Sequence, residues 1–172
     1  GTLLIEAADI ALNRAPGRGR SFAFPKLNGF VPNNWATLLE AARAAERRVT
    51  SLPIHGSDRY VPALETAHNN LVSAGLEKAI TLASADILET RPWIDHGLIV
   101  TNPPYGVRLD DQDRLAALYP RLGDWLKQHW AGWNVFFLTG DPLLAKKIRL
   151  SASRRTPLFN GAIECRLFEY RM

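Results

Sequence analysis

Asn102-Pro103-Pro104-Tyr105 is the segment best suited to chemistry in this chain, and only Thr101 separates it from the apolar run Leu98-Ile99-Val100. An exocyclic amine on a nucleic-acid base is a poor nucleophile, because its lone pair is delocalised into the ring. The Asn102 side-chain oxygen and the Pro103 carbonyl could each accept one N–H of such an amine, and two prolines stiffen the turn. Tyr105 offers a flat face on which an extruded base can stack. The pattern therefore predicts methyl transfer to a base amino group, with a rigid strand-to-helix turn as the alternative.

Two acidic residues come after other expected strands. Asp58 ends the sequence Gly56-Ser57-Asp58, and Asp86 precedes the apolar Ile87. Ligands of open α/β sheets bind beyond the carboxyl ends of the strands, where a carboxylate can accept hydrogen bonds from ribose hydroxyls. Asp86 could likewise accept from an adenine amino group while Ile87 packs on the ring. Either acid alone would more often cap a loop, but together with Asn102 they favour a nucleotide site.

Helices and strands alternate along the chain, which predicts an α/β sheet with helices on both faces. A pair of antiparallel strands around Asn160-Gly161 closes the chain, because Asn-Gly is a strong hairpin signal. A doubly wound, Rossmann-like sheet with such a hairpin is typical of nucleotide-binding methyltransferases. The expected helices are 2–13, 35–48, 61–73, 115–130 and 142–148, and the expected strands are 52–55, 79–82, 97–101, 134–138, 150–157 and 162–170.

The whole chain is consistent with one globular domain, 1–172, of 172 residues with 47% hydrophobic and 22% charged residues. No apolar run approaches the length of a membrane span, and no leader peptide is visible. The single cysteine, Cys165, favours a reducing cytoplasm. The four histidines show no ligand spacing, so we expect no metal.

The basic residues form several groups within a net charge of +4, a balance that permits a polyanionic partner. Each group is most simply a solvated face. Arg18 and Arg20 lie in a Pro/Gly-rich loop, where exposed arginines can reach phosphates. These two are the sequence's best candidates for RNA contact.

The order and spacing of several motifs resemble a known family, the THUMP-associated RNA guanine-N2-methyltransferases. The opening Gly1-Thr2-Leu3-Leu4-Ile5-Glu6-Ala7-Ala8 is similar to the end of that family's S-adenosylmethionine motif. The other matching motifs are Ala15-Pro16-Gly17, Gly56-Ser57-Asp58, Asn102-Pro103-Pro104-Tyr105-Gly106 with Arg108-Leu109, Gly132-Trp133-Asn134, and Asn160-Gly161. Asn-Pro-Pro-Tyr alone is shared with DNA adenine methylases, whereas the combination is more specific. The resemblance is closest to members that act on 23S ribosomal RNA, and it covers nearly all of the chain.

This resemblance implies a class I fold, S-adenosylmethionine as methyl donor and guanine N2 in 23S ribosomal RNA as acceptor. It implies that Asp58 holds the donor's ribose, and that Asp86 and Ile87 hold its adenine. Gly1 and Thr2 would border the methionine moiety. Residues 102–105 would hold the target base, with Asn102 also bordering the donor.

The sequence departs from the family pattern at its beginning. It starts in the middle of the glycine motif, without the family's first strand or the RNA-capturing THUMP region, so we expect a fragment of a longer gene product. The absent strand should lie between the strands near Leu52 and Leu98, and its loss should impair turnover. Three alternatives stay open: adenine-N6 methylation of DNA or RNA, guanine-N2 methylation of tRNA, and a non-catalytic RNA-binding remnant.

Overall fold

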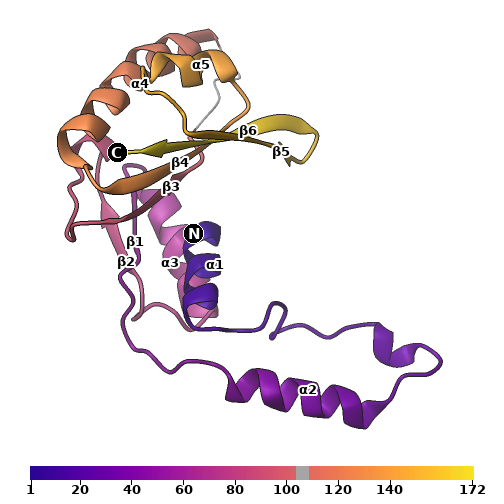
Figure 1. Cartoon of the computed structure of the whole chain (residues 1–172). Coiled ribbons are helices and arrows are strands. Elements are labelled where there is room, and N and C mark those ends of the chain that lie inside the picture. The colour runs from indigo at the N-terminus through magenta and orange to yellow at the C-terminus, as the bar shows by residue number, and fades with distance from the viewer. Residues whose placement is uncertain (104–108) are drawn as a thin grey trace. The chain divides into compact units, whose positions relative to one another are not determined.

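The structure, a computed structural model, describes residues 1–103 and 109–172, and the side chains of all of these except 109–112. It divides into two compact units, residues 1–87 and 88–172 (Figure 1). The first unit contains α1 (Thr2–Ala11), η1 (Phe24–Lys26), α2 (Pro32–Ala44), β1 (His55–Asp58), α3 (Val61–Ser73) and β2 (Thr81–Ser84). The short helix η2 (Ile87–Glu89) spans the boundary, and the second unit contains β3 (Gly97–Thr101), α4 (Leu109–His129), β4 (Trp133–Thr139), α5 (Pro142–Lys147), β5 (Arg154–Asn160) and β6 (Ile163–Arg171).

The first unit is built on the parallel pair β1–β2, with α1 and α3 beside it. Its core is a small apolar cluster of Ala8, Leu12, Leu71, Leu76, Ala79 and Ile80. β1 consists of His55-Gly56-Ser57-Asp58, so the strand includes the polar residues at which we expected it to stop. Pairing with the β2 segment already begins upstream, where Leu52 N–H donates to Ala79 C=O at 2.9 Å.

Helix α3 has the limits that its sequence predicts. Pro62 lies in its first turn, where the missing N–H costs nothing. At its C-terminal end Gly75 has a φ of +64°, and Gly75 N–H and Leu76 N–H donate to Val72 C=O and Leu71 C=O. This reciprocal pattern is a Schellman motif, which a glycine stabilises because it adopts positive φ without steric cost.

Helix α2 begins earlier than expected and buries no residue. Its N-cap is Val31 rather than Asn34, because Pro32, with its fixed φ, occupies the first turn. Trp35 holds the helix to the preceding loop through edge-on contacts with Phe22 and Phe24, at ring-centroid distances of 5.8 and 4.8 Å. These aromatic contacts take the place of a conventional core here.

The second unit is a mixed sheet of order β3-β4-β6-β5, with α4 and α5 on the same side of it (Figure 1). β3 and β4 are parallel, while β6 runs antiparallel to both β4 and β5. β5 and β6 form the predicted hairpin, and Gly161 in its turn has a φ of +61°. The α/β class and the antiparallel hairpin predicted from the sequence are therefore confirmed.

Strand β3 has the limits that its sequence predicts, but its side chains are less buried than an all-apolar strand suggests. Leu98 and Val100 are 63% and 51% exposed, whereas Ile99 on the other face is half-buried. Within the described part of the chain β3 is hydrogen-bonded to β4 alone. One edge of β3 is therefore unpaired among the described residues, and the face that carries Leu98 and Val100 is exposed.

Tryptophans fill the core of the second unit at the end where β4 begins. Trp130 packs edge-on against Trp133 at 4.7 Å, and Trp125 and Trp93 extend the cluster. Trp125 Nε1–H donates to Thr90 C=O at 3.1 Å. Among the described helices, none is long and apolar enough to cross a membrane.

Candidate functional site

The predicted donor residues Asp58, Asp86 and Ile87 lie at one end of the first unit's sheet. Asp58 is the last residue of β1 and is paired in register with Ser84, the last residue of β2. Ala85 N–H donates to Asp58 C=O at 3.2 Å, so the chain leading into Asp86 continues alongside β1. Since the strands are parallel, both carboxylates follow carboxyl ends at the same edge, as the sequence predicts.

The Asp58 carboxylate is oriented by the turn into α3. Its Oδ1 accepts a hydrogen bond from Tyr60 N–H at 2.9 Å, and the side chain is exposed. This contact orients one of the two carboxylate oxygens. An exposed carboxylate held in this way is suited to accepting hydrogen bonds from hydroxyl groups of a ligand. Asp86 and Ile87 are half-buried.

Gly1 and Thr2 form the N-terminal end of α1, next to α3 and β1. Gly1 is the N-cap, and its carbonyl accepts from Leu4 N–H and Ile5 N–H, both at 3.1 Å. A Cβ at Gly1 would lie 3.2 Å from the Ala67 side chain, so α1 and α3 approach closely. A second close approach holds Leu4 over Gly56 of β1. The structure thus places the start of α1 beside the strand that ends in Asp58.

Asn102 and Pro103 belong to the second unit and directly follow β3. Asn102 is exposed and Pro103 half-buried. The other two predicted base-binding residues, Pro104 and Tyr105, lie outside the described residues. Asn102 therefore occupies the carboxyl end of a parallel strand, which is where the sequence predicts it.

Arg18 and Arg20, the predicted RNA contacts, are exposed but engaged in intramolecular contacts. Arg18 Nη2 donates to Ala74 C=O at 3.3 Å, and its Nη1 lies 3.9 Å from Glu46 Oε2. The Arg20 guanidinium lies 5.7 Å from the centre of the Phe22 ring. Both contacts leave further N–H donors on each guanidinium, so contact of these residues with RNA stays a prediction.

A hollow that the sequence did not predict lies between α3 and β2. Its lining residues are Leu64, Glu65, His68, Asn69, Leu82, Ala83 and Ser84. It lies beside Ser84 but includes none of the predicted donor residues. No group of three or more His, Cys, Asp or Glu side chains gathers in the described part of the chain. Because the hollow contains none of the predicted donor residues, we place the candidate site at the strand ends instead.

The chain matches a family model described as "RMKL-like, methyltransferase domain" over residues 1–169. The ribosomal RNA large subunit methyltransferase K/L of Methylococcus capsulatus is 42% identical over 170 residues, which are 97% of this chain and 23% of that protein. The protein of the same name from Marinobacter nauticus is 38% identical over 179 residues, covering 100% of this chain and 25% of its own length. The chain thus spans about a quarter of the length of these relatives.

Solved structures also resemble the chain over nearly its whole length. One is a protein assigned as a methyltransferase, SMU.472, complexed with SAH, with a TM-score of 0.92 and 29% identity over 99% of this chain and 45% of that one. Another is a predicted N6-adenine-specific DNA methylase from Listeria monocytogenes, with a TM-score of 0.86 and 30% identity over 99% and 43%. The family model covers residues 1–169 of the chain, and the chain belongs to the RMKL-like methyltransferase domain family.

Proposed function

We propose that this chain forms the donor-binding and base-binding part of an enzyme that methylates the exocyclic N2 of a guanine in 23S ribosomal RNA, with S-adenosylmethionine as donor. The observation that carries the proposal is the position of Asn102, directly after a parallel strand in a chain of this family. The K/L name of the relatives supports ribosomal RNA as the acceptor. Such a substrate implies that the enzyme works inside the cell.

The residues of the first unit fit the donor. Asp58 offers an exposed, oriented carboxylate for the ribose hydroxyls. Asp86 supplies an acceptor and Ile87 an apolar surface for the adenine, while Gly1 and Thr2 offer the N-terminal end of α1 to the donor's amino-acid portion. When bound, S-adenosylmethionine supplies an electrophilic methyl group on a sulfonium sulfur.

Asn102 and Pro103, which follow β3, would orient the amino group of the acceptor base. The Asn102 amide oxygen and the Pro103 carbonyl accept the two N–H groups of the base amine, which directs the nitrogen lone pair toward the methyl group. Because residue 104 is also proline, its ring restricts the backbone of Pro103 and so helps to fix the direction of this carbonyl. Asn102 and Pro103 thus act by positioning the reactants and favouring the transition-state geometry.

The test uses the complete protein that the gene encodes, S-adenosylmethionine with a labelled methyl group, and ribosomal RNA from cells lacking the gene. We expect labelled N2-methylguanosine after digestion to nucleosides. Asn102→Ala should lower the rate about 10²–10³-fold, by analogy with loss of one oriented hydrogen-bonding group at a reacting centre. Asn28→Ala, an exposed asparagine in the loop before α2, is the matched control and should leave the rate unchanged.

A second candidate is N6-methylation of adenine, which the name of the Listeria structure favours. It uses the same Asn102 chemistry, so the nucleoside product separates the two. Labelled N6-methyladenosine without N2-methylguanosine would overturn the guanine proposal. Methylated guanine in tRNA but not in ribosomal RNA would correct the acceptor, and an Asn102→Ala protein as active as wild type would favour a non-catalytic remnant.

A further inference from the structure

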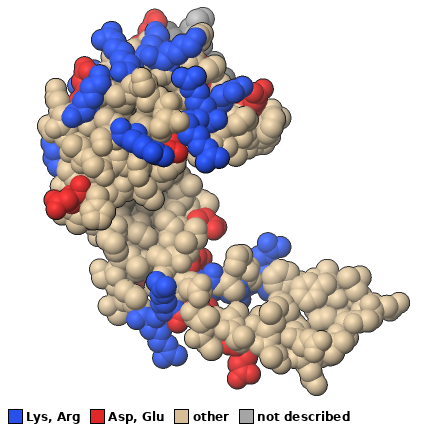
Figure 2. All heavy atoms as spheres, viewed as in Figure 1, with Lys and Arg blue, Asp and Glu red and all other residues tan. Residues whose placement is uncertain are grey.

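The second unit carries a run of positive charge that the proposed methyl-transfer chemistry does not use. Between Asp141 and Glu164 the chain contains five basic residues and no acidic one. All five are exposed: Lys146, Lys147, Arg149, Arg154 and Arg155. They come from α5, from the connection after it and from the start of β5. Figure 2 shows Lys and Arg side chains gathered over α4, α5 and the hairpin, with few acidic ones among them.

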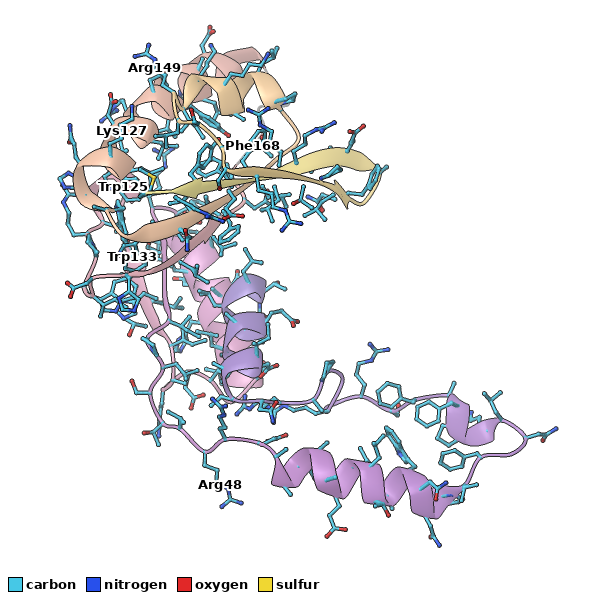
Figure 3. All side chains as sticks on the ribbon, viewed as in Figure 1. Arg48, Trp125, Lys127, Trp133, Arg149 and Phe168 are labelled. Carbon is cyan, nitrogen blue, oxygen red and sulfur yellow. The ribbon has the colours of Figure 1, made fainter. Side chains whose placement is uncertain are left out.

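The strand register shows which of these charges share a side of the sheet. Arg155 is paired with Phe168, and Phe168 with Phe137. Phe137 packs against Tyr119 of α4 at a ring-centroid distance of 5.7 Å, so this is the face that the helices cover. Arg155 therefore lies on the same side as α5. In Figure 3, Lys127 and Arg149 point outward from the same helical layer.

The basic surface ends at an exposed aromatic ring. Phe159 follows Arg155 by four residues on β5 and so shares its face. The ring is 74% exposed and makes no aromatic contact with any described residue. By contrast, Phe168, further along the same face, is buried and lies 5.9 Å from the Arg155 guanidinium. Phe159 is thus a large apolar side chain with no internal packing role.

An exposed ring on the same sheet face as Arg155, in a unit rich in exposed cations, matches the chemistry of unpaired RNA, whose phosphates attract lysine and arginine and whose bases stack on aromatic rings. Insertion of the hairpin into a membrane fits less well. Phe159 is paired directly with Glu164, which is itself bridged to Arg166 at 3.0 Å, and burying that pair in lipid would be costly.

We propose that α5, the connection after it and the β5–β6 hairpin form an RNA-binding surface. In this surface Phe159 stacks on an unpaired base, while Lys146, Lys147, Arg149 and Arg155 contact phosphates. The inference rests on the proposed function for its substrate class, and it adds the part of the chain that grips the RNA next to the target. It also assigns RNA contact to residues other than Arg18 and Arg20.

Binding of a hairpin-loop RNA derived from 23S ribosomal RNA to the complete protein tests this proposal, with affinity measured by fluorescence anisotropy at several salt concentrations. Phe159→Ala should weaken binding about 5- to 150-fold, the range for loss of one stacked base, and Phe159→Trp should restore it. Lys146→Ala/Lys147→Ala/Arg149→Ala should reduce the slope of log affinity against log salt by about 2. Arg47→Ala/Arg48→Ala, two exposed arginines of the first unit, form the matched control and should change neither quantity by a comparable amount.

The outcomes separate this inference from the proposed function. If the wild-type protein methylates ribosomal RNA but the Phe159 and triple variants bind it as tightly as wild type, the surface is refuted and the proposed function stands. If the wild-type protein forms no N2-methylguanosine, the proposed function fails by itself. The Phe159 and triple variants are also compared with wild type on vesicles of phosphatidylcholine and phosphatidylglycerol. If these variants lose binding to the vesicles but keep the wild-type affinity for RNA, the surface binds membranes and the RNA assignment is overturned.

Discussion

Gly123 in the middle of α4 lies against the backbone of α5, and adding one methyl group there should destabilise the second unit. A Cβ at this position would overlap the carbonyl oxygen of Ile148 and lie 3.0 Å from its carbonyl carbon. A backbone carbonyl cannot rotate away as a side chain can. Gly123→Ala therefore requires α4 and α5 to separate.

Two effects of opposite sign set the magnitude. Alanine in place of glycine in a helix is intrinsically stabilising by about 1 kcal/mol. Overpacking of a tight contact typically costs about 1–3 kcal/mol, and more where backbone must move. Ile148 is fully buried, and the neighbouring Leu144 and Ala145 are buried as well, so α5 has little room to shift. We therefore expect a net loss of about 2 kcal/mol.

Urea unfolding followed by tryptophan fluorescence measures this change, because the second unit contains the buried cluster of Trp125, Trp130 and Trp133. Ala117→Gly, at an exposed position of the same helix, reports the helix-propensity term alone and should cost about 1 kcal/mol. If Gly123→Ala instead raises stability by about 1 kcal/mol, as helix propensity alone would predict, then α4 and α5 do not pack as described.

Three further predictions concern single side chains. Gly97→Ala would place a Cβ 2.7 Å from the buried Trp133 ring, so we expect a loss of about 1–3 kcal/mol in the same unfolding assay; unchanged stability would show that the ring can move. Burial raises the pKa of Tyr170 from 10.0 to about 12, against the opposing charge of Arg155. The folded protein then keeps a proton that the unfolded chain loses, so stability should fall by up to about 1.4 kcal/mol per pH unit between pH 10 and 12, and Tyr170→Phe should flatten that slope. Asp58→Asn keeps an oxygen for Tyr60 N–H but loses the charge; calorimetry should show about tenfold weaker donor binding at unchanged stability, and equal affinity would exclude Asp58 as the ribose ligand.

The elements whose ends are set by local chemistry could be predicted from the sequence. α3 ends where Gly75 adopts positive φ, and the hairpin turns at Gly161, as glycine at those positions indicates. β3 was predicted with its observed limits, because the apolar run 98–100 is followed by Thr101 and then by Asn102-Pro103. The position of Asn102 at a strand end followed from that limit alone.

Elements that depend on distant partners were predicted less well. Gly56-Ser57-Asp58 has the composition of a turn, yet it forms β1 because residues 81–84 pair with it in parallel. α4 begins at Leu109 rather than Leu115, since the acidic stretch 110–113 hides its apolar period. The basic surface was visible only as separate charge groups, because strand register and helix packing decide which charges share a face.

Cys165 is the only cysteine in the chain and is 1% exposed on β6. A thiol reagent can reach it only when the structure around β6 opens, so the rate of alkylation reports the free energy of that opening. The chain thus carries its own label for local unfolding. Any cysteine introduced on an exposed position, such as Phe159 or Asn102, should react first and alone under native conditions, which makes the hairpin and the β3 end accessible to single-site spectroscopic probes.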